Sequence, residues 1–177
     1  ATSFKEIGTE SAPGTKIVSL SGVINRTGIA EVPMGMTLAD IIYQIGGGPK
    51  PGHVIGLLGI GGPSSGVLPV SMLHTPIKGG ILHESGVMLG AGGIIVIDDQ
   101  VSLLEVARNL ASYNANESCG KCTPCREGTP RMVQLIDKIA AGDGDNRDID
   151  ELSFLSEIVN TASLCGLGQA AGNPILS

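Results

Sequence analysis

The sequence is poor in charged residues and has no cluster of basic ones. Asp, Glu, Lys and Arg make up 16% of the 177 residues, against about a quarter in an average soluble domain. The formal net charge is −6, so the chain lacks the clustered excess of Lys and Arg that binding to nucleic-acid phosphates requires. We therefore expect no nucleic-acid partner, and we expect other proteins to cover part of the surface.

Long apolar runs are also missing. No stretch approaches the roughly 20 apolar residues that a bilayer-spanning helix needs. The N-terminal residues ATSFKEIGTE lack the basic and apolar regions of a signal peptide. We therefore expect a protein without direct membrane insertion and with a cytoplasmic location, including the cytoplasmic face of a membrane-bound complex.

Recognisable catalytic groups are scarce. The three histidines, His53, His74 and His83, lie in loop-like regions at no ligand-like spacing, with no nucleophile or carboxylate obviously paired to them. The acidic segment GDGDNRDID, residues 142–150, is interpreted as a solvated turn between two helices. No Asp or Glu pair is placed for acid–base work, so we expect that the chain alone is not a complete enzyme.

The first part of the chain has the pattern of a small α+β unit. Residues 15–24 are rich in β-branched side chains and, with a short strand at 29–32, predict a β-hairpin. Thr37 begins a predicted helix that ends at Gly46. Its apolar face consists of Leu38, Ile41, Ile42 and Ile45. Three or more short strands are predicted between 54 and 97, which gives a first domain of residues 1–98.

The periodicity changes after Asp99. Apolar residues then recur at helical spacing around 101–111, 132–139 and 152–159. Three or four helices are predicted, which makes residues 99–177 an all-α bundle. The expected fold class is α+β, with a strand-containing domain followed by a helical one.

Glycine is abundant, and two glycine-rich stretches invite comparison with phosphate-binding loops. These are residues 56–66 and 90–93. Read from Gly59, the sixth position of the first stretch is Ser64 instead of glycine, and no clear helix with a later ribose-binding acid follows. Tight turns and close backbone contacts explain these glycines better than a nucleotide site does.

The strongest chemical signal is the arrangement of the four cysteines. Cys119, Cys122 and Cys125 form a C-x-x-C-x-x-C run, and Cys165 follows much later in the chain. A [4Fe-4S] cluster has four iron corners, so three thiolates from one tight loop and a fourth from a distant segment can ligate it. All four are therefore candidate iron ligands.

Two alternatives remain for the cysteines. Zinc also accepts four thiolates, but its sites usually pair two C-x-x-C knuckles, and Cys165 has no cysteine beside it. A disulfide or thiol-exchange pair would leave two cysteines without a role. If a cluster binds, five nearby residues are candidates for tuning its potential, although plain loop packing explains each of them equally well: Ser118, Gly120, Lys121, Thr123 and Arg126.

Two runs resemble a known family. ESCGKCTPCREGTPRM, residues 117–132, and SLCGLGQAAGNPILS, residues 163–177, closely resemble the C-terminal region of the flavin-bearing, NADH-oxidising subunit of respiratory complex I. Diaphorase subunits of NAD(P)-linked hydrogenases and formate dehydrogenases share these motifs. Upstream, residues 7–48 resemble the family's soluble-ligand-binding β-grasp (SLBB) domain, and LGAGGIIVIDD resembles the segment that joins the two domains.

This resemblance implies a ubiquitin-like β-grasp domain, a helical [4Fe-4S] domain and ligation by all four cysteines. The family's N-terminal domain, which carries FMN and the NADH site, has no counterpart in the sequence, so FMN and NAD(H) are implied only for a full-length parent. The implied function is one-electron relay from flavin to partner subunits that carry further iron–sulfur clusters. The alternative is a partner- or ligand-binding module in which the cluster, or zinc, has a structural role.

Overall fold

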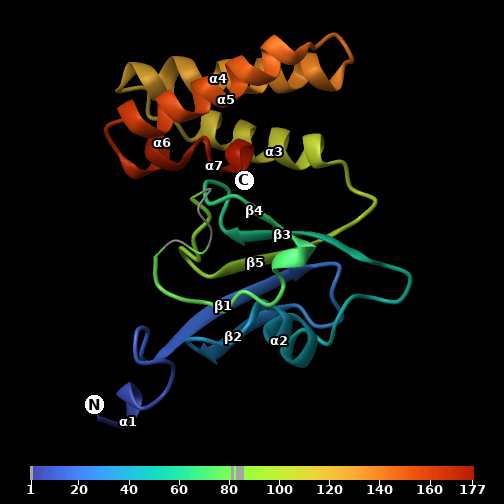
Figure 1. Ribbon diagram of the computed structural model, residues 1–177, viewed down its shortest axis with the longest axis vertical. Coiled ribbons are helices and arrows are strands. Elements are labelled where there is room, and N and C mark those ends of the chain that lie inside the picture. Colours follow the sequence, from blue (N-terminus) through green and yellow to red (C-terminus); the bar gives the residue numbers. More distant parts are fainter. Residues whose placement is uncertain (1, 81, 83–85) are drawn as a thin grey trace. The chain divides into compact units, whose positions relative to one another are not determined.

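The computed structural model describes residues 2–80, 82 and 86–177. The fold is α+β, as predicted (Figure 1). The chain forms two compact units, of which the first comprises 1–62 with 67–101 and the second comprises 63–66 with 102–177. The first unit holds the sheet and the second holds the long helices. Of the histidines discussed above, His83 lies outside the described residues.

A mixed five-stranded sheet builds the first unit. The strand order is β2-β1-β5-β3-β4, in which β1 and β5 are parallel and the other neighbours are antiparallel. The predicted hairpin is the β1–β2 pair. This strand order, with one helix after the first hairpin, is that of the β-grasp, or ubiquitin-like, fold. The strands are β1 (Thr15–Gly22), β2 (Gly28–Pro33), β3 (Ile55–Gly61), β4 (Val67–Pro69) and β5 (Gly93–Asp98).

The predicted helix at Thr37 is present, but its second half is wider than an α-helix. It starts as α2 (Leu38–Asp40) and continues as the π-helix η1 (Ile41–Ile45). The Thr37 hydroxyl accepts a hydrogen bond from the Asp40 backbone N–H at 3.1 Å, which caps the first turn. The Gly46 N–H donates to the Ile41 carbonyl, five residues earlier, at 3.0 Å, which is the hydrogen-bond spacing of a π-helix. Four apolar residues are too few to distinguish this spacing from that of an α-helix.

One face of the sheet forms the core of the first unit. In β1, Val18 and Leu20 are buried, whereas the preceding residues Ile17 and Ser19 are exposed, which is the alternation of a half-buried strand. The buried side chains of the helix pack in the same core. The largest members are Ile24, Leu38, Ile41, Ile42, Leu58, Ile60, Leu68, Ile77 and Ile94.

The first glycine-rich stretch is mostly strand, not loop. Residues 56–61 belong to β3, which pairs with β5. A Cβ atom added to Gly56 would lie 2.5 Å from the Asp99 Cα atom. Glycine therefore permits the close backbone approach that the sequence suggested for this stretch.

Helices form the second unit. In Figure 1, α4 and α5 run side by side, and α3 packs against α4. Met132, Leu135, Ile136 and Val159 are almost fully buried between them. The helices are α3 (Leu103–Asn116), α4 (Thr123–Ala140), α5 (Asn146–Ala162), α6 (Gly166–Ala170) and α7 (Asn173–Leu176).

Two short elements complete the described chain. They are α1 (Thr2–Lys5) before the sheet and the 3₁₀ turn η2 (Val70–Met72) after β4. Within the described residues, none of the helices combines the length and apolar character needed to cross a bilayer.

The interpretation of 142–150 as a solvated turn is wrong for its second half. Asp145 is the N-cap of α5, and its carboxylate accepts hydrogen bonds from the N–H groups of Arg147 and Asp148. The Asp148 carboxylate in turn accepts a hydrogen bond from the Asp145 N–H, which completes a capping box. The Asp148 side chain is buried. Acidic residues near a helix start stabilise it, so a charged segment that looked like a turn forms the first helical turn.

Candidate metal centre

The helical unit brings the four cysteines to one cavity of about 220 Å³. Cys119 lies in the loop before α4, Cys122 is the N-cap of α4, and Cys125 lies in the first turn of that helix. Cys165 is the N-cap of α6. All four are free thiols, and the cavity is completed by Glu117, Ser118, Lys121 and Leu167.

The thiols differ in exposure. Cys125 is buried, Cys122 is half-buried, and Cys119 and Cys165 are exposed. The cavity therefore has a closed side at Cys125 and an open side where solvent reaches the other segments. A group bound here would lie close to the protein surface.

The protein favours the thiolate form of Cys122. The backbone N–H of Leu164 and then that of Cys125 hold the pKa of the Cys122 thiol below its usual value of 9.0, and the Ser163 hydroxyl adds a smaller effect in the same direction, against the opposing effect of burial. The N-terminus of the 18-residue helix α4 also favours negative charge at this end. Metals bind the thiolate, so this environment prepares Cys122 for ligation.

The loop between the first two cysteines is held in shape by one arginine. Gly120 has a φ of +75°, a conformation that side-chain-bearing residues rarely adopt. Arg126 donates from Nη1 to the Gly120 carbonyl at 2.8 Å and from Nη2 to the Thr123 hydroxyl at 3.4 Å. The turn that places Cys119 opposite Cys122 is therefore tied to the first turns of α4.

Two serine hydroxyls lie beside the cysteines, and one of them contacts a sulfur atom. The Ser118 Oγ is 3.2 Å from the Cys125 Sγ. The Ser163 Oγ is buried, and among the described side chains it is the buried polar atom without a well-formed hydrogen bond. A Cβ atom on Gly168 would lie 2.4 Å from this Oγ and 3.3 Å from the Cys125 Cβ, so a glycine keeps the space beside the cysteines clear.

The five residues named from the sequence as possible tuning groups have different positions. Ser118 contacts a sulfur atom, and Lys121 lines the cavity. Gly120, Thr123 and Arg126 shape the loop. Ser163 was not among the residues named from the sequence, although its place two residues before Cys165 was a usable signal.

The residues present fit an iron–sulfur cluster. Four thiols from two segments line a single cavity, and a buried hydroxyl beside them has no well-formed hydrogen bond. Thiolates spaced around one cavity suit an inorganic group with four separate ligand corners. Among the described residues, no three His, Cys, Asp or Glu side chains are grouped closely enough to hold a single metal ion.

Comparison with family models matches both units. Residues 105–177 match the iron–sulfur binding region of NADH-ubiquinone oxidoreductase F, and residues 17–68 match the SLBB domain. Each match covers less than half of the chain, and together they account for both of its domains. The recognition made from the two cysteine-containing runs is thereby confirmed, and so is the expectation of an iron–sulfur cofactor.

Individual relatives agree with these two matches. The chain is 41% identical over 174 residues to the NADP-reducing hydrogenase subunit HndC of Solidesulfovibrio fructosivorans, with 98% of this chain and 36% of that protein covered. It is 36% identical over 168 residues to the NADH-quinone oxidoreductase F-2 subunit of Rhizobium meliloti, with 95% and 40% covered. The chain thus spans well under half the length of these relatives.

A solved structure shows the same arrangement of elements. The crystal structure of an NAD⁺-reducing [NiFe]-hydrogenase in the H₂-reduced state matches with a TM-score of 0.84 and 30% sequence identity. The match covers 98% of this chain and 29% of the hydrogenase chain. The fold class predicted from the sequence is confirmed by this match.

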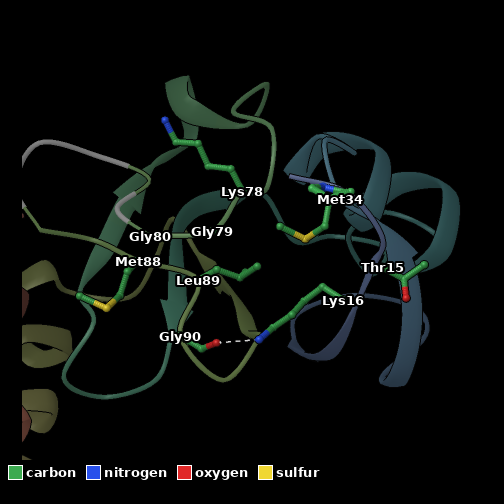
Figure 2. A pocket seen from close by; sticks show the side chains of 10 residues that line it. Thr15, Lys16, Met34, Lys78, Gly79, Gly80, Met88, Leu89 and Gly90 are labelled. Atoms are coloured by element: carbon green, nitrogen blue, oxygen red, sulfur yellow. Dashed lines mark hydrogen bonds between the residues drawn. The ribbon is translucent and has the colours of Figure 1, made fainter. Parts of the chain in front are cut away.

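The unit that contains the SLBB match has a larger cavity, of about 410 Å³ (Figure 2). Lys16 donates from Nζ to the Gly90 carbonyl at 2.9 Å. In Figure 2, Lys78 extends away from Leu89 and Met34, so the two lysine amino groups do not converge. The described lining residues therefore do not form a compact anion site.

The expectation that no histidine has a carboxylate partner is wrong for His53. Its Nδ1 lies 2.5 Å from the Asp98 Oδ2 at the end of β5. The pKa of Asp98 lies below its usual value of 3.8, chiefly because its carboxylate accepts a hydrogen bond from the Gln100 backbone N–H. The hydrogen bond to His53 has the second-largest effect in this direction. Because the two residues are 45 positions apart in the chain, only the folded sheet brings them together.

Proposed function

We propose that this chain is the electron-relay part of an NADH-oxidising subunit, with one [4Fe-4S] cluster ligated by Cys119, Cys122, Cys125 and Cys165. The observation that carries the proposal is that all four cysteines, from two distant segments, line one cavity. The match of residues 105–177 to an iron–sulfur binding region supports the same assignment.

The geometry favours a cluster over a single zinc ion. Zinc–sulfur bonds of about 2.3 Å would bring tetrahedral thiolates to within about 4 Å of one another. The described side chains contain no such grouping of three ligands. A four-iron cluster separates its ligands by the width of its core, which suits thiols arranged around a cavity of this size.

The residues of the chain hold and surround the cluster. Cys122 and Cys125 would bind it at the N-terminal end of α4, where the helix dipole favours thiolates. Cys119, from the loop before α4, and Cys165, from the second segment, would complete the site. Arg126 fixes the loop between the first two ligands. When bound, a [4Fe-4S] cluster accepts and donates one electron at a time.

The domain assignment follows from the same proposal. Residues 1–98 serve as the SLBB domain and residues 99–177 as the [4Fe-4S] domain, supported by the two family matches. In the full-length parent, NADH would deliver a hydride to FMN, and electrons would then pass singly to this domain. FMN and NAD(H) sites are assigned to that parent and not to these two domains.

The relatives are named as subunits of hydrogenases and quinone oxidoreductases, so partner subunits are a shared feature. We extend this to partners that carry further iron–sulfur clusters, in a complex located in the cytoplasm or on the cytoplasmic face of a membrane. Exposed apolar side chains support a protein contact at the open side of the site. Leu164, directly beside Cys165, is 70% exposed.

The test is reconstitution of the 177-residue chain with iron and sulfide under anaerobic conditions. Iron, acid-labile sulfide and zinc are then measured, and an electron paramagnetic resonance (EPR) spectrum is recorded after dithionite reduction. We expect about four iron and four sulfide per chain and the signal of a reduced cluster. A variant with all four cysteines replaced by serine should bind neither, while its circular dichroism reports whether the helices remain.

Other results would contradict the proposal. Stoichiometric zinc, with no visible absorption and no EPR signal, would indicate a structural metal site. Unchanged cluster binding after replacement of Cys165 by serine, together with loss on replacing an unrelated residue, would show that the ligands have been misassigned.

A further inference from the structure

We infer that Ser118 and Ser163 set the redox potential of the cluster by donating hydrogen bonds from their hydroxyls to the ligand sulfurs of Cys125 and Cys122. This inference rests on the proposed function, because it concerns the same four-cysteine site. It assigns a positioning role to two residues that are not ligands.

The direction of the Ser118 hydrogen bond is set by the state of the sulfur. The Gly120 backbone N–H donates to the Ser118 Oγ at 3.4 Å and leaves the hydroxyl proton free. That proton can point to the Cys125 Sγ, 3.2 Å away. An iron-bound thiolate has no proton of its own and can only accept, so ligation removes the ambiguity that a free thiol would leave.

Ser163 reaches the site from the other segment. It lies before Cys165 and is buried, and its hydroxyl has no well-formed hydrogen bond in the described structure. A buried hydroxyl without a partner is unfavourable, so a strong acceptor is expected beside it. Geometry places this hydroxyl beside the cysteines, because a Cβ atom added to Gly168 would lie 2.4 Å from the Ser163 Oγ and 3.3 Å from the Cys125 Cβ. A ligand thiolate at this cavity, for which we take that of Cys122, would supply the missing acceptor.

The two serines act on the half-buried and buried thiols. Cys125 is buried and Cys122 is half-buried, whereas Cys119 and Cys165 are exposed. Water can donate to exposed sulfurs, but it reaches buried ones poorly, so fixed protein donors matter most at the less exposed thiols.

The sign of the effect is fixed by charge. Reduction adds one electron to the cluster and increases the negative charge on its cysteinyl sulfurs. Hydrogen-bond donors stabilise the more negative state, so they raise the reduction potential. Removing a hydroxyl should therefore make the cluster harder to reduce and weaken its ability to take electrons from the flavin side of the parent.

The experiment is an EPR-monitored redox titration of the reconstituted 177-residue chain. Ser118→Ala and Ser163→Ala are each compared with the wild type. We expect each substitution to lower the equilibrium constant for reduction of the cluster about tenfold. For a one-electron couple this corresponds to a fall of about 59 mV in the reduction potential. Ser118→Thr, which keeps a hydroxyl, should stay near the wild-type potential.

Thr123→Ala is the matched control. Thr123 is the first residue of α4 and is exposed, and its hydroxyl accepts from Arg126, which also holds the loop through the Gly120 carbonyl. Its replacement removes one hydroxyl beside the loop without removing a hydrogen bond to sulfur, and should leave the potential unchanged. A shift as large as that of Ser118→Ala would show that the potential responds to loop disturbance and would overturn the inference.

The remaining outcomes separate this inference from the proposed function. If the wild type binds no cluster, the proposed function itself fails. If the wild type binds a cluster and the two serine variants titrate at its potential, only the inference fails. If neither alanine variant retains a cluster, the inference is tested by resonance Raman spectra of the wild type and of Ser118→Thr, recorded in H₂O and in D₂O. Iron–sulfur stretching bands that do not move on deuteration would overturn the inference.

Discussion

Asp148, in the first turn of α5, holds the Lys138 amino group near the end of α4, with both carboxylate oxygens 2.8 Å from Nζ. The same carboxylate accepts from the Asp145 N–H at 2.8 Å. One buried acid therefore joins two helices and caps one of them. Lys138 first, and then the Asp145 N–H, hold the pKa of Asp148 below its usual value of 3.8.

Acid should destabilise the helical unit through Asp148. A carboxyl whose pKa is lower in the folded protein contributes stability above its unfolded pKa, and that contribution is lost as the pH falls through the folded value. We therefore expect urea midpoints to fall as the pH drops below about 4. In Asp148→Asn, the midpoint at pH 7 should be lower and this acid-dependent loss smaller.

The control for this prediction is Asp150→Asn. Asp150 is an exposed residue of the same helix, and it forms no ion pair with the described residues. Its urea midpoint at pH 7 should match the wild type. An Asp148→Asn protein that keeps the full acid-dependent loss would show that other carboxyl groups cause it.

Replacing Gly56 should destabilise the protein, because β3 lies close to the backbone of Asp99 at this position. The Cβ atom of an alanine would lie 2.5 Å from the Asp99 Cα atom, a contact that backbone cannot relieve without shifting. We expect Gly56→Ala to cost about 1–3 kcal/mol in the free energy of unfolding, the range typical of overpacking. Gly59→Ala in the same strand, whose nearest atom would be the Ile95 Cβ at 3.4 Å, should change stability by less than about 1 kcal/mol.

Gly168 should matter for cluster retention. An alanine there would collide with Ser163, whose Cβ and Oγ lie 2.4 Å from the added atom, and would press on Cys125. We expect Gly168→Ala to bind iron about tenfold more weakly, as for other residues that support metal ligands. Gly166→Ala, two residues earlier in α6, meets no atom within 4 Å and should retain the wild-type iron content.

Arg126 should slow the loss of the cluster. Its hydrogen bond to the Gly120 carbonyl holds the loop between Cys119 and Cys122. In Arg126→Met, which keeps the apolar stem but not the donors, visible absorbance should bleach about tenfold faster in the presence of an iron chelator.

Arg131→Met is the comparison for Arg126. Arg131 lies on the same helix and pairs with Glu151, in an exposed ion pair away from the cysteines. Such pairs contribute little to stability. Equal bleaching rates for the two arginine variants would assign the effect to α4 as a whole and not to the loop.

Much of the secondary structure followed from local patterns. The β1–β2 hairpin, the helix start at Thr37 and the helical second unit all rest on periodicity and capping, which neighbouring residues specify. The π-helical turn at 41–45 and the helical start at Asn146 did not follow, because one turn of apolar residues fits either spacing and an acidic run suits both a turn and a helix N-terminus.

The sequence by itself determined the fold class, the four candidate ligands and the family, because cysteine spacing and hydrophobic period are properties of the linear chain. Tertiary structure alone decided which side chains surround the thiols. Ser163 and Cys125 both lie beside Gly168 because α6 folds back to the start of α4. His53 meets Asp98 for the same kind of reason. Contacts between distant segments depend on the packing of whole elements, which no local pattern encodes.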